Sequence, residues 1–475
     1  MKWNNLILPA GILLLNVVIK LLFIDQTAIG GDEPFTLFYA QTDYETLFAM
    51  LETENNPPLY TFIMKYWIQF FGNDVLTVRI LPLLFSSFTA VGIYQLGRLY
   101  WSRFVGITAA LIFTFANYHI YFSHESRPYA LFAMLTVFSI LVFLQVTIDG
   151  RKRRIYLLAL LNVLLIYNHF FGFFVLFVQF LSFLIIRPIR TSAWKPLFIS
   201  WGLVVIGYLP YIPFILKRFG HASGGTWLKA PPLDGLYTNL WNFSNQPINV
   251  MIALSVFLAA IVLWVIRKRE IKKPAVIILV IWFLIPYFLM FALSFKIPMF
   301  LDRYLVYISI AYYLLIAVSM EYIAAGKNYK WFFGGALVIL MACTSNFNSG
   351  NTRNDDQLVK EIISSKSENT AVILCPDWYF MTFSYHYDRS IFNDYRNSKA
   401  RLEAQNIFPR AYLNSNNNSQ ILNKEHVIFV NTGAYYVDPK NKIQRMLLDH
   451  FVLTSENYEF EPYVISHYRK KVITN

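Results

Sequence analysis

The sequence predicts a polytopic α-helical membrane protein that carries a small soluble α/β domain at its C-terminal end. Hydrophobic residues make up 56% of the 475 residues and charged residues only 15%, against about 25% charged in an ordinary soluble domain. Mean hydropathy is +0.43. The charges are clustered, and the apolar runs between them, of roughly 15–22 residues, have the length that a lipid bilayer requires. The composition changes sharply after residue 348.

Eleven apolar runs are candidate membrane spans. The first follows a single lysine and lacks a small-residue cleavage site, so we expect it to be retained as a helix. The fifth and sixth are short and form either two spans or one re-entrant pair. The expected spans are 6–24, 76–98, 104–121, 129–148, 155–170, 172–187, 197–215, 249–266, 275–295, 303–323 and 331–347.

The distribution of Lys and Arg predicts the orientation of these spans. Over residues 1–347, with the N-terminus inside the cell, seventeen Lys and Arg fall in inside segments and nine at outside positions. This bias predicts a multi-pass protein of the cell (inner) membrane, with a cytoplasmic N-terminus and, after eleven crossings, an outer or periplasmic C-terminus. The formal net charge of +13 is explained by these short loops, and no nucleic-acid partner is expected.

Three segments on the predicted outer side are more than simple loops. Residues 25–75 contain two aromatic, amphipathic stretches that predict helices lying along the membrane interface. Residues 216–248, with His221 and Trp227, form a glycine- and proline-rich loop that either orders over a site or is an ordinary connection. The strand-like runs "TAVILC", "HVIFVN" and "PYVISHY" predict a soluble α/β domain over 349–475.

We therefore expect a membrane module over 1–348 and an outer domain that recognises an acceptor or supports the module. The two cysteines, Cys343 and Cys375, match no metal spacing and are not expected to form a disulfide. No two histidines have a diagnostic ligand spacing. No metal ligand is assigned on these grounds, and the cofactor, including a divalent metal, stays open.

Polar residues gather where the predicted spans reach the outer side. An ionisable group inside a span costs about 2.5–3.5 kcal/mol on insertion scales, so several such groups at one level suggest a polar site. They follow the first span in "GGDEP", lie between the third and fourth spans in "HIYFSHESRPYALF", and recur in "YNHFFGFF" and "LDRYLVY". The candidates are Asp32, Glu33, Arg127, Tyr129, His169, Arg303 and Tyr304.

These residue types suit one kind of chemistry. Two arginines can hold a phosphate through charge-assisted, bidentate bonds, and at the membrane boundary that phosphate belongs to a lipid. A carboxylate facing the same site can accept a proton from a hydroxyl group, while the cations stabilise the departing phosphate. Together, two arginines and a carboxylate could transfer a group from a lipid phosphate to a hydroxyl group. Nucleotide-activated donors are cytoplasmic, whereas a flipped lipid-linked donor can be used outside.

The ordered set of motifs resembles the membrane glycosyltransferases of family 39, which include the protein O-mannosyltransferases and the bacterial enzyme that transfers aminoarabinose to lipid A. The motifs are "GDEPFTLFYA", "NNPPLYTFIMKYW", "SRPYALFAML", "YNHFFGFF" and "DRYLVY", over about residues 1–350. The resemblance implies the GT-C fold, a polyprenyl-phosphate sugar donor and inversion at the anomeric carbon. It also implies that the acidic catalytic residue lies at Asp32 or Glu33, with Arg303, Arg127, Tyr129, His169 and Tyr304 around the donor phosphate.

The sequence departs from this family at one place. The lipid A enzymes have an essential glutamate just before the Pro-Pro-Leu motif, followed by a lysine, whereas this chain has Asn55 and Asn56, and Glu54 stands one residue too early. That glutamate is implicated in metal binding in the family. Its absence puts a metal here in doubt and favours Asp32 as the base, while Asn56 becomes a candidate substrate contact.

Simpler explanations stand beside each assignment. Asp32 or Glu33 can cap a helix that has Pro34 at its start, and Arg127 and Arg303 can be interfacial anchors. His169, like His119 and His124, can be a hydrogen-bonded packing residue. We expect a membrane glycosyltransferase that moves a sugar from polyprenyl phosphate to a hydroxyl acceptor of the cell envelope, whether glycan, lipid or protein. A transporter or flippase for a lipid-linked sugar and a non-catalytic scaffold are the alternatives.

Overall fold

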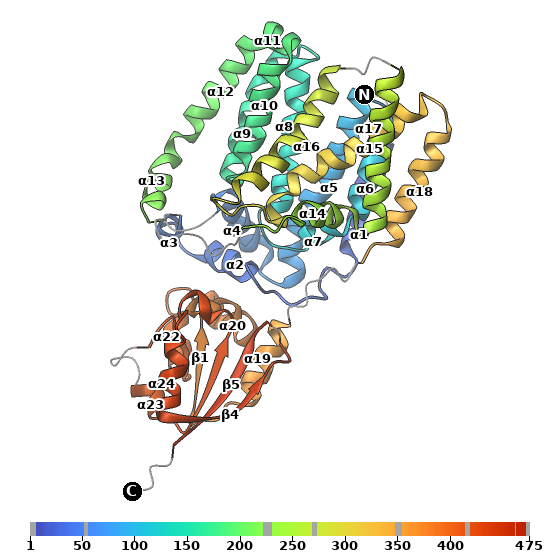
Figure 1. Cartoon of the computed structure of the whole chain (residues 1–475). Coiled ribbons are helices and arrows are strands. Elements are labelled where there is room, and N and C mark those ends of the chain that lie inside the picture. Colours follow the sequence, from blue (N-terminus) through green and yellow to red (C-terminus); the bar gives the residue numbers. More distant parts are fainter. Residues whose placement is uncertain are drawn as a thin grey trace. The chain divides into compact units, whose positions relative to one another are not determined.

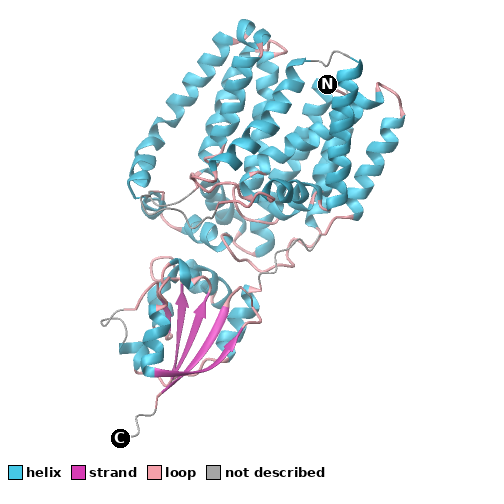
Figure 2. Ribbon diagram, in the orientation of Figure 1, coloured by secondary structure: helices cyan, strands magenta, loops and turns pink. Residues whose placement is uncertain are grey.

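The computed structural model describes residues 6–51, 56–221, 230–267, 273–346, 354–413, 419–460 and 462–471. The chain forms two compact units. One comprises residues 1–24 and 45–351, and the other comprises 25–44 and 352–475. Helices build the first unit, and the strands lie in the second (Figures 1 and 2). The predicted domain limits, 1–348 and 349–475, stay a prediction, but residues 25–44 pack with the C-terminal unit in the structure.

Each of the eleven predicted spans contains a helix of the first unit. Within the described ranges, six helices are long and apolar enough to cross a membrane, or seven if one bent pair counts as a single span. The number of eleven crossings therefore stays a prediction. The helices are α1 (Ile7–Leu21), α5 (Val75–Tyr100), α6 (Arg103–Phe115), α8 (Tyr129–Thr147), α9 (Ile155–Asn168), α10 (Gly172–Ile185), α12 (Trp194–Tyr208), α15 (Pro247–Arg267), α16 (Lys273–Leu293), α17 (Val306–Ala324) and α18 (Tyr329–Cys343).

Shorter helices connect these elements. They are α3 (Tyr44–Met50), α4 (Leu59–Phe71), α7 (Asn117–Ser123), α11 (Arg187–Ser192), α13 (Ile212–His221) and α14 (Gly235–Ser244), with single turns η2 (Lys152–Arg154), η3 (Leu209–Tyr211) and η5 (Asp302–Tyr304). Pro57 and Pro58 directly precede α4, so the second of the two predicted interfacial stretches begins at its prolines. Trp227 and the rest of the loop at 222–229 lie outside the described residues.

The predicted third span, 104–121, is not one straight helix. It breaks at Ala116, whose backbone is extended, and α7 continues from α6 at an angle of 65°. A break inside an apolar bundle exposes backbone groups that lipid cannot satisfy. Asn245 satisfies them here: its Oδ1 accepts from the Asn117 N–H at 2.8 Å, and its Nδ2 donates to the Phe115 carbonyl at 2.9 Å. The break therefore depends on a side chain that is distant in the sequence.

Three polar side chains bind α8, α9 and α10 to one another. Ser139 donates to the Asn162 Oδ1 at 2.6 Å, Asn162 donates to Gln179 at 2.9 Å, and Gln179 donates back to the Ser139 Oγ at 2.8 Å. All three side chains are buried. Hydrogen bonds of this kind are the specific contacts available between apolar helices in a membrane. This triangle fixes how far each helix slides along the others, and so where their ends meet.

Small residues allow a close helix contact between α5 and α6. A Cβ atom on Gly97 would lie 2.6 Å from the Cα of Gly106, and one on Gly106 would lie 2.5 Å from the Tyr94 carbonyl oxygen. The two backbones therefore touch directly, as small residues permit in membrane helices.

The second unit is a five-stranded sheet with helices on both faces. The strand order is β2-β1-β3-β5-β4, with β1, β2 and β3 parallel and the pairs β3–β5 and β4–β5 antiparallel. The elements are α2 (Glu33–Gln41), α19 (Asp355–Ser364), β1 (Thr370–Cys375), η6 (Asp377–Tyr379), α20 (Phe380–Tyr387), α21 (Arg389–Asn393), α22 (Ser398–Glu403), β2 (Ile407–Pro409), α23 (Ser419–Leu422), β3 (His426–Asn431), η7 (Ala434–Tyr436), α24 (Lys442–His450), β4 (Phe451–Asn457) and β5 (Val464–Lys470).

The central strand of this sheet explains why its sequence is apolar throughout. Every residue of β1 is buried, because helices cover both faces of a parallel strand and remove the usual alternation. Ile373 and Phe429 contribute to one core, which Ile443 and Leu447 of α24 cover. The three strand-like runs of the sequence correspond to β1, β3 and β5. The two cysteines are free, with Cys343 exposed and Cys375 buried.

Asn245→Gly is expected to destabilise the membrane unit. Asn245 has a φ of 65°, a conformation that glycine adopts without strain, so the substitution removes hydrogen bonds alone. Each buried group left without a partner costs about 1–3 kcal/mol, and we expect a clearly lower midpoint of thermal unfolding in detergent. Asn328→Gly, at an exposed N-cap without a side-chain bond, is the matched control. Equal midpoints for the two variants would contradict the role of Asn245.

Candidate functional site

The structure gathers four of the predicted site residues near a fifth, His169, whose buried ring lies between α9 and α10. The ring is stacked between Phe132 and Phe171, with centroid distances of 4.9 and 5.2 Å and interplanar angles of 13° and 27°. Tyr304 and Tyr129 also contact it, at 5.5 and 6.2 Å. Only 3% of His169 is exposed.

One nitrogen of the His169 ring accepts a hydrogen bond, and the other has no partner among the described residues. The Phe171 N–H donates to His169 Nδ1 at 3.2 Å, so the proton of the neutral ring lies on Nε2. Within the described part of the chain, Nε2 has no hydrogen-bond partner. A buried N–H donor without a partner is costly, so this nitrogen is available to donate to a ligand.

Both predicted phosphate ligands lie close enough to act on this ring. The positive charges of Arg127 and Arg303 each bear electrostatically on the His169 imidazole. Arg127 is 6% exposed and immediately precedes Pro128 at the start of α8, and the Arg303 guanidinium lies 5.4 Å from the Tyr304 ring. Arg303 thus lies beside the Tyr304 ring that contacts His169, and Arg127 lies just before α8, whose first residue, Tyr129, also contacts His169.

Backbone contacts from neighbouring elements hold these groups in place. The Asn168 side chain, at the end of α9, donates to the Pro128 carbonyl at 3.1 Å and joins it to the start of α8. Ser126 donates to the Val78 carbonyl of α5 at 3.1 Å. The Tyr118 hydroxyl of α7 donates to the Asp302 carbonyl of η5. The bend between α6 and α7 therefore helps to position Arg303.

The two predicted acids belong to the other compact unit and are described by themselves. Asp32 is exposed and precedes α2, and Glu33 is buried in its first turn. Gly31 makes the preceding turn with a φ of 57°. Asp32 occupies the N-cap position, with Pro34 in the first turn, but its side chain makes no capping hydrogen bond. Asp32 is thus at the N-cap position of α2 but does not form the side-chain hydrogen bond by which an N-cap residue stabilises a helix.

Asn56, His119 and His124 are the remaining candidates, and the two histidines have structural hydrogen-bond partners. Asn56 is half-buried just before Pro57 and α4, and the ring contacts around His169 do not include it. His119 and His124 are buried and bonded to structural partners: the Ser309 hydroxyl at 2.7 Å and the Lys20 carbonyl at 2.7 Å. Both fit the packing role that the sequence left open for them.

Sequence reasoning overlooked a buried cation in the first helix. Lys20 is fully buried; its Nζ donates to the Ser86 Oγ at 2.5 Å and lies 4.3 Å from the centre of the Phe113 ring. Its position at the end of an apolar run was the available signal, because a lysine there either snorkels to the interface or is held inside by the fold.

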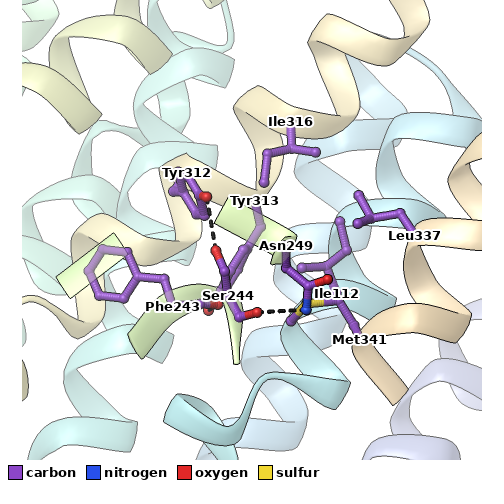
Figure 3. A pocket seen from close by; sticks show the side chains of 9 residues that line it. All are labelled: Ile112, Phe243, Ser244, Asn249, Tyr312, Tyr313, Ile316, Leu337 and Met341. Atoms are coloured by element: carbon purple, nitrogen blue, oxygen red, sulfur yellow. Dashed lines mark hydrogen bonds between the residues drawn. The ribbon is translucent and has the colours of Figure 1, made fainter. Parts of the chain in front are cut away.

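Two cavities in the described part of the membrane unit are lined by residues other than these. Figure 3 shows one of about 10 Å³, lined by Phe243, Tyr312, Asn249 and neighbouring side chains, where Ser244 and Tyr312 are bonded at 2.9 Å. This volume is close to that of a single water probe. A groove of about 360 Å³ between α15, α16 and α17 is lined almost wholly by apolar side chains. In the described ranges, no group of three or more His, Cys, Asp and Glu side chains could hold a metal ion.

Comparisons with known proteins agree with this architecture. A family model described as dolichyl-phosphate-mannose-protein mannosyltransferase matches residues 55–216. The crystal structure of ArnT from Cupriavidus metallidurans in the apo state aligns with a TM-score of 0.59 at 12% identity, covering 98% of each chain. The same protein bound to undecaprenyl phosphate aligns with a TM-score of 0.55 at 11% identity, again over 98% of each chain.

The archaeal oligosaccharyltransferase AglB from Archaeoglobus fulgidus, in complex with an inhibitory peptide and a dolichol-phosphate, aligns with a TM-score of 0.54 at 10% identity. The alignment covers 100% of this chain and 75% of AglB. No curated protein sequence matches the chain. The predicted fold class is confirmed: this is a multi-pass GT-C fold with a small C-terminal sheet. The family model and the fold together support the predicted membrane glycosyltransferase.

The structure predicts different outcomes for two substitutions of His169. His169→Phe keeps a ring between Phe132 and Phe171 and loses one hydrogen bond, worth about 1 kcal/mol. His169→Ala removes the ring and leaves a cavity, and we expect a loss of about 2–5 kcal/mol. Thermal or denaturant unfolding in detergent measures both. If the two variants were equally stable, the stacked packing of the ring would be wrong.

Proposed function

We propose that this GT-C membrane glycosyltransferase moves a sugar from a polyprenyl-phosphate donor to a hydroxyl group of a cell-envelope acceptor, with inversion at the anomeric carbon. The observation that carries the proposal is the placement of Arg303 beside the Tyr304 ring and of Arg127 two residues before Tyr129, because both tyrosine rings contact the buried ring of His169. A site with two fixed cations and an unused buried N–H donor is suited to a dianionic or monoanionic phosphate.

The donor phosphate is bound by Arg303 and Arg127, with His169 Nε2–H as a third donor. Burial strengthens these interactions, because the low dielectric of a site at the membrane boundary screens charge less than water does. Tyr129 and Tyr304 line the same place and contribute ring surface. Two of the similar structures contain undecaprenyl phosphate and dolichol-phosphate, lipids that present one phosphate at the membrane surface, and this agrees with the donor class.

The chemical step is a single displacement. Asp32 accepts the proton of the acceptor hydroxyl, and the hydroxyl oxygen attacks the anomeric carbon from the face opposite the phosphate. The bond between the anomeric carbon and the phosphate oxygen breaks, and its electron pair leaves with the phosphate. Arg303 and Arg127 stabilise the charge that develops on this leaving group. Glu33 positions the acceptor, and Asn56 contacts substrate.

In this proposal the reaction takes place on the outer face of the inner membrane, where a flipped lipid-linked sugar is available. The predicted excess of Lys and Arg in cytoplasmic loops supports an outer position for the ends of these helices. The acceptor is a glycan, lipid or protein of the envelope. A transporter for the same lipid would also bind the phosphate, but it would have no need of Asp32 as a base.

Loss of either arginine is expected to weaken donor binding. Arg303→Gln and Arg127→Gln each remove a charged hydrogen bond worth about 1.5–3 kcal/mol, which raises the Kd for undecaprenyl phosphate roughly 10-fold to 100-fold. Binding is measured with the protein in lipid nanodiscs. Arg153→Gln, at an exposed position of η2, is the matched control. An unchanged Kd for both test variants would remove the phosphate site from this cluster.

Loss of the proposed base is expected to affect turnover alone. Asp32→Asn should lower kcat by about 10²–10⁴-fold, the usual contribution of general base catalysis, and leave the Kd for undecaprenyl phosphate unchanged. The donors are undecaprenyl phosphate bearing mannose or aminoarabinose, with envelope membranes as acceptor and undecaprenyl phosphate release as the readout. Asp25→Asn, an exposed acid of the same segment, is the control. Undiminished sugar transfer by Asp32→Asn would refute its role, and donor flipping without transfer would favour the transporter.

A further inference from the structure

The segment that carries Asp32 and Glu33 packs with the C-terminal unit, although it directly follows the first membrane helix in the sequence. Residues 25–44 belong to the same compact unit as residues 352–475, and hydrogen-bond partners within it are more than 350 residues apart. The chain on both sides of the segment, residues 1–24 and 45 onward, belongs to the membrane unit. The acids are thus held by a domain that the sequence places at the other end of the protein.

Apolar side chains make the first contact. Phe38 of α2 is 6% exposed and packs edge-on against two rings of the C-terminal unit: Phe380 of α20 at 5.2 Å and Phe392 of α21 at 5.7 Å. Tyr385 of α20 packs in turn against Phe392 at 5.1 Å. Edge-to-face arrangements at these distances are favourable and directional, so they fix the rotation of α2 as well as its distance from α20.

A hydrogen bond fixes the chain just before the acids. His386 Nε2 lies 2.6 Å from the carbonyl oxygen of Ile29, and Ile29 is fully buried. Burial lowers the pKa of His386, so at neutral pH the ring is uncharged and its Nε2–H donates to this carbonyl. Only Gly30 and Gly31 separate Ile29 from Asp32, and the Gly31 turn directs the chain into α2.

A third contact fixes the chain after α2. Asp43 Oδ2 accepts from the Tyr395 hydroxyl at 2.7 Å and from Arg396 Nη2 at 2.7 Å. Arg396 is largely exposed, so water screens its charge, and the geometric constraint matters more than the charge itself. The three contacts lie before, within and after the nine-residue helix that Asp32 precedes.

We propose that the C-terminal α/β unit is the positioning domain of the acid: its residues His386, Tyr395 and Arg396, together with the Phe380 and Phe392 rings, hold the segment 25–44 and thereby orient Asp32. These are positioning residues, because they act through the segment and touch no reacting group. A side chain carried at the start of a short helix moves with that helix, so loosening both ends displaces Asp32. A base displaced by about 1 Å can lose 10²-fold in rate.

This inference rests on the proposed function, in which Asp32 is the base, and its test separates the two. The full chain in lipid nanodiscs is compared with the double variant Asp43→Ala/His386→Leu, which removes the polar contacts on both sides of α2. Asp43→Asn/His386→Gln is the conservative variant, because both new side chains can make the same bonds. Asp377→Ala is the control: it removes an ion pair of similar exposure, to Lys399 in the same unit, and substitutes none of the residues that contact the segment.

Two readouts are measured. Hydrogen–deuterium exchange of peptides from residues 25–44 is expected to rise at least 10-fold in the double variant, while peptides of β1 and β3 keep their protection. The kcat of sugar transfer is expected to fall at least 10-fold with an unchanged Kd for undecaprenyl phosphate. The conservative variant and Asp377→Ala should resemble the unmodified protein in both. A general loss of folding would instead raise exchange in β1 and β3, and the single variant Tyr395→Phe then supplies the milder test.

The outcomes are distinct. If Asp32→Asn abolishes transfer while the double variant keeps its kcat and its protection of residues 25–44, the positioning role is overturned and the proposed function stands. If exchange rises with no change in kcat, the unit holds the segment but does not orient the base, and the inference again fails. If Asp32→Asn itself transfers sugar normally, the proposed role of Asp32 fails first, and with it the meaning of its positioning.

Discussion

The membrane unit depends on one constraint: a polar group among apolar helices must find its partner inside the protein. Water is absent there, and each unsatisfied group costs free energy comparable to a hydrogen bond or more. The chain meets this constraint with amide and hydroxyl side chains in a few places. The Ser139–Asn162–Gln179 triangle joins three helices. The Asn245 side chain forms hydrogen bonds with the backbone groups that lose their helical partners where α6 ends.

The candidate donor site follows from those internal bonds. The triangle sets the relative heights of α8, α9 and α10, so the start of α8 and the end of α9 lie side by side, where Asn168 bonds to the Pro128 carbonyl. The bend at Ala116 redirects α7 so that Tyr118 reaches the backbone before α17. Arg127 and Arg303 come from two distant parts of the sequence, and a position at a helix end avoids the cost of a charge at the bilayer centre. His169 remains as a buried donor between them.

The acids are held by a different kind of interaction. Aromatic packing and an imidazole–carbonyl bond join α2 and the residues before it to α20 and α21, in a unit whose own core is a mixed sheet with a fully buried central strand, β1. A short segment of nine helical residues has little stability alone, since isolated helices of this length are marginal in water. Its conformation is therefore a property of the α/β unit, and this is why a C-terminal domain can influence a residue near the N-terminus.

The sequence by itself determined the fold class, the positions of the membrane helices and three strands of the sheet, β1, β3 and β5. These depend on local patterns: the length of an apolar run or a buried strand of β-branched residues. It also named His169 and the two tyrosines that contact it, because polar and aromatic residues at the ends of apolar runs are visible without a structure, but it did not name Phe132 and Phe171, whose rings stack on the imidazole. The sequence did not predict β2 and β4, because β2 has only three residues and β4 is mostly exposed.

Only the tertiary structure decided which partners satisfy the polar groups. The break at Ala116 has no local signal, because its cause is Asn245, more than 120 residues away. The association of residues 25–44 with the C-terminal unit is equally invisible, since its contacts join Ile29 and Asp43 to His386 and Tyr395. Local sequence sets what a segment can form, whereas burial and hydrogen bonding between distant segments set where its side chains lie.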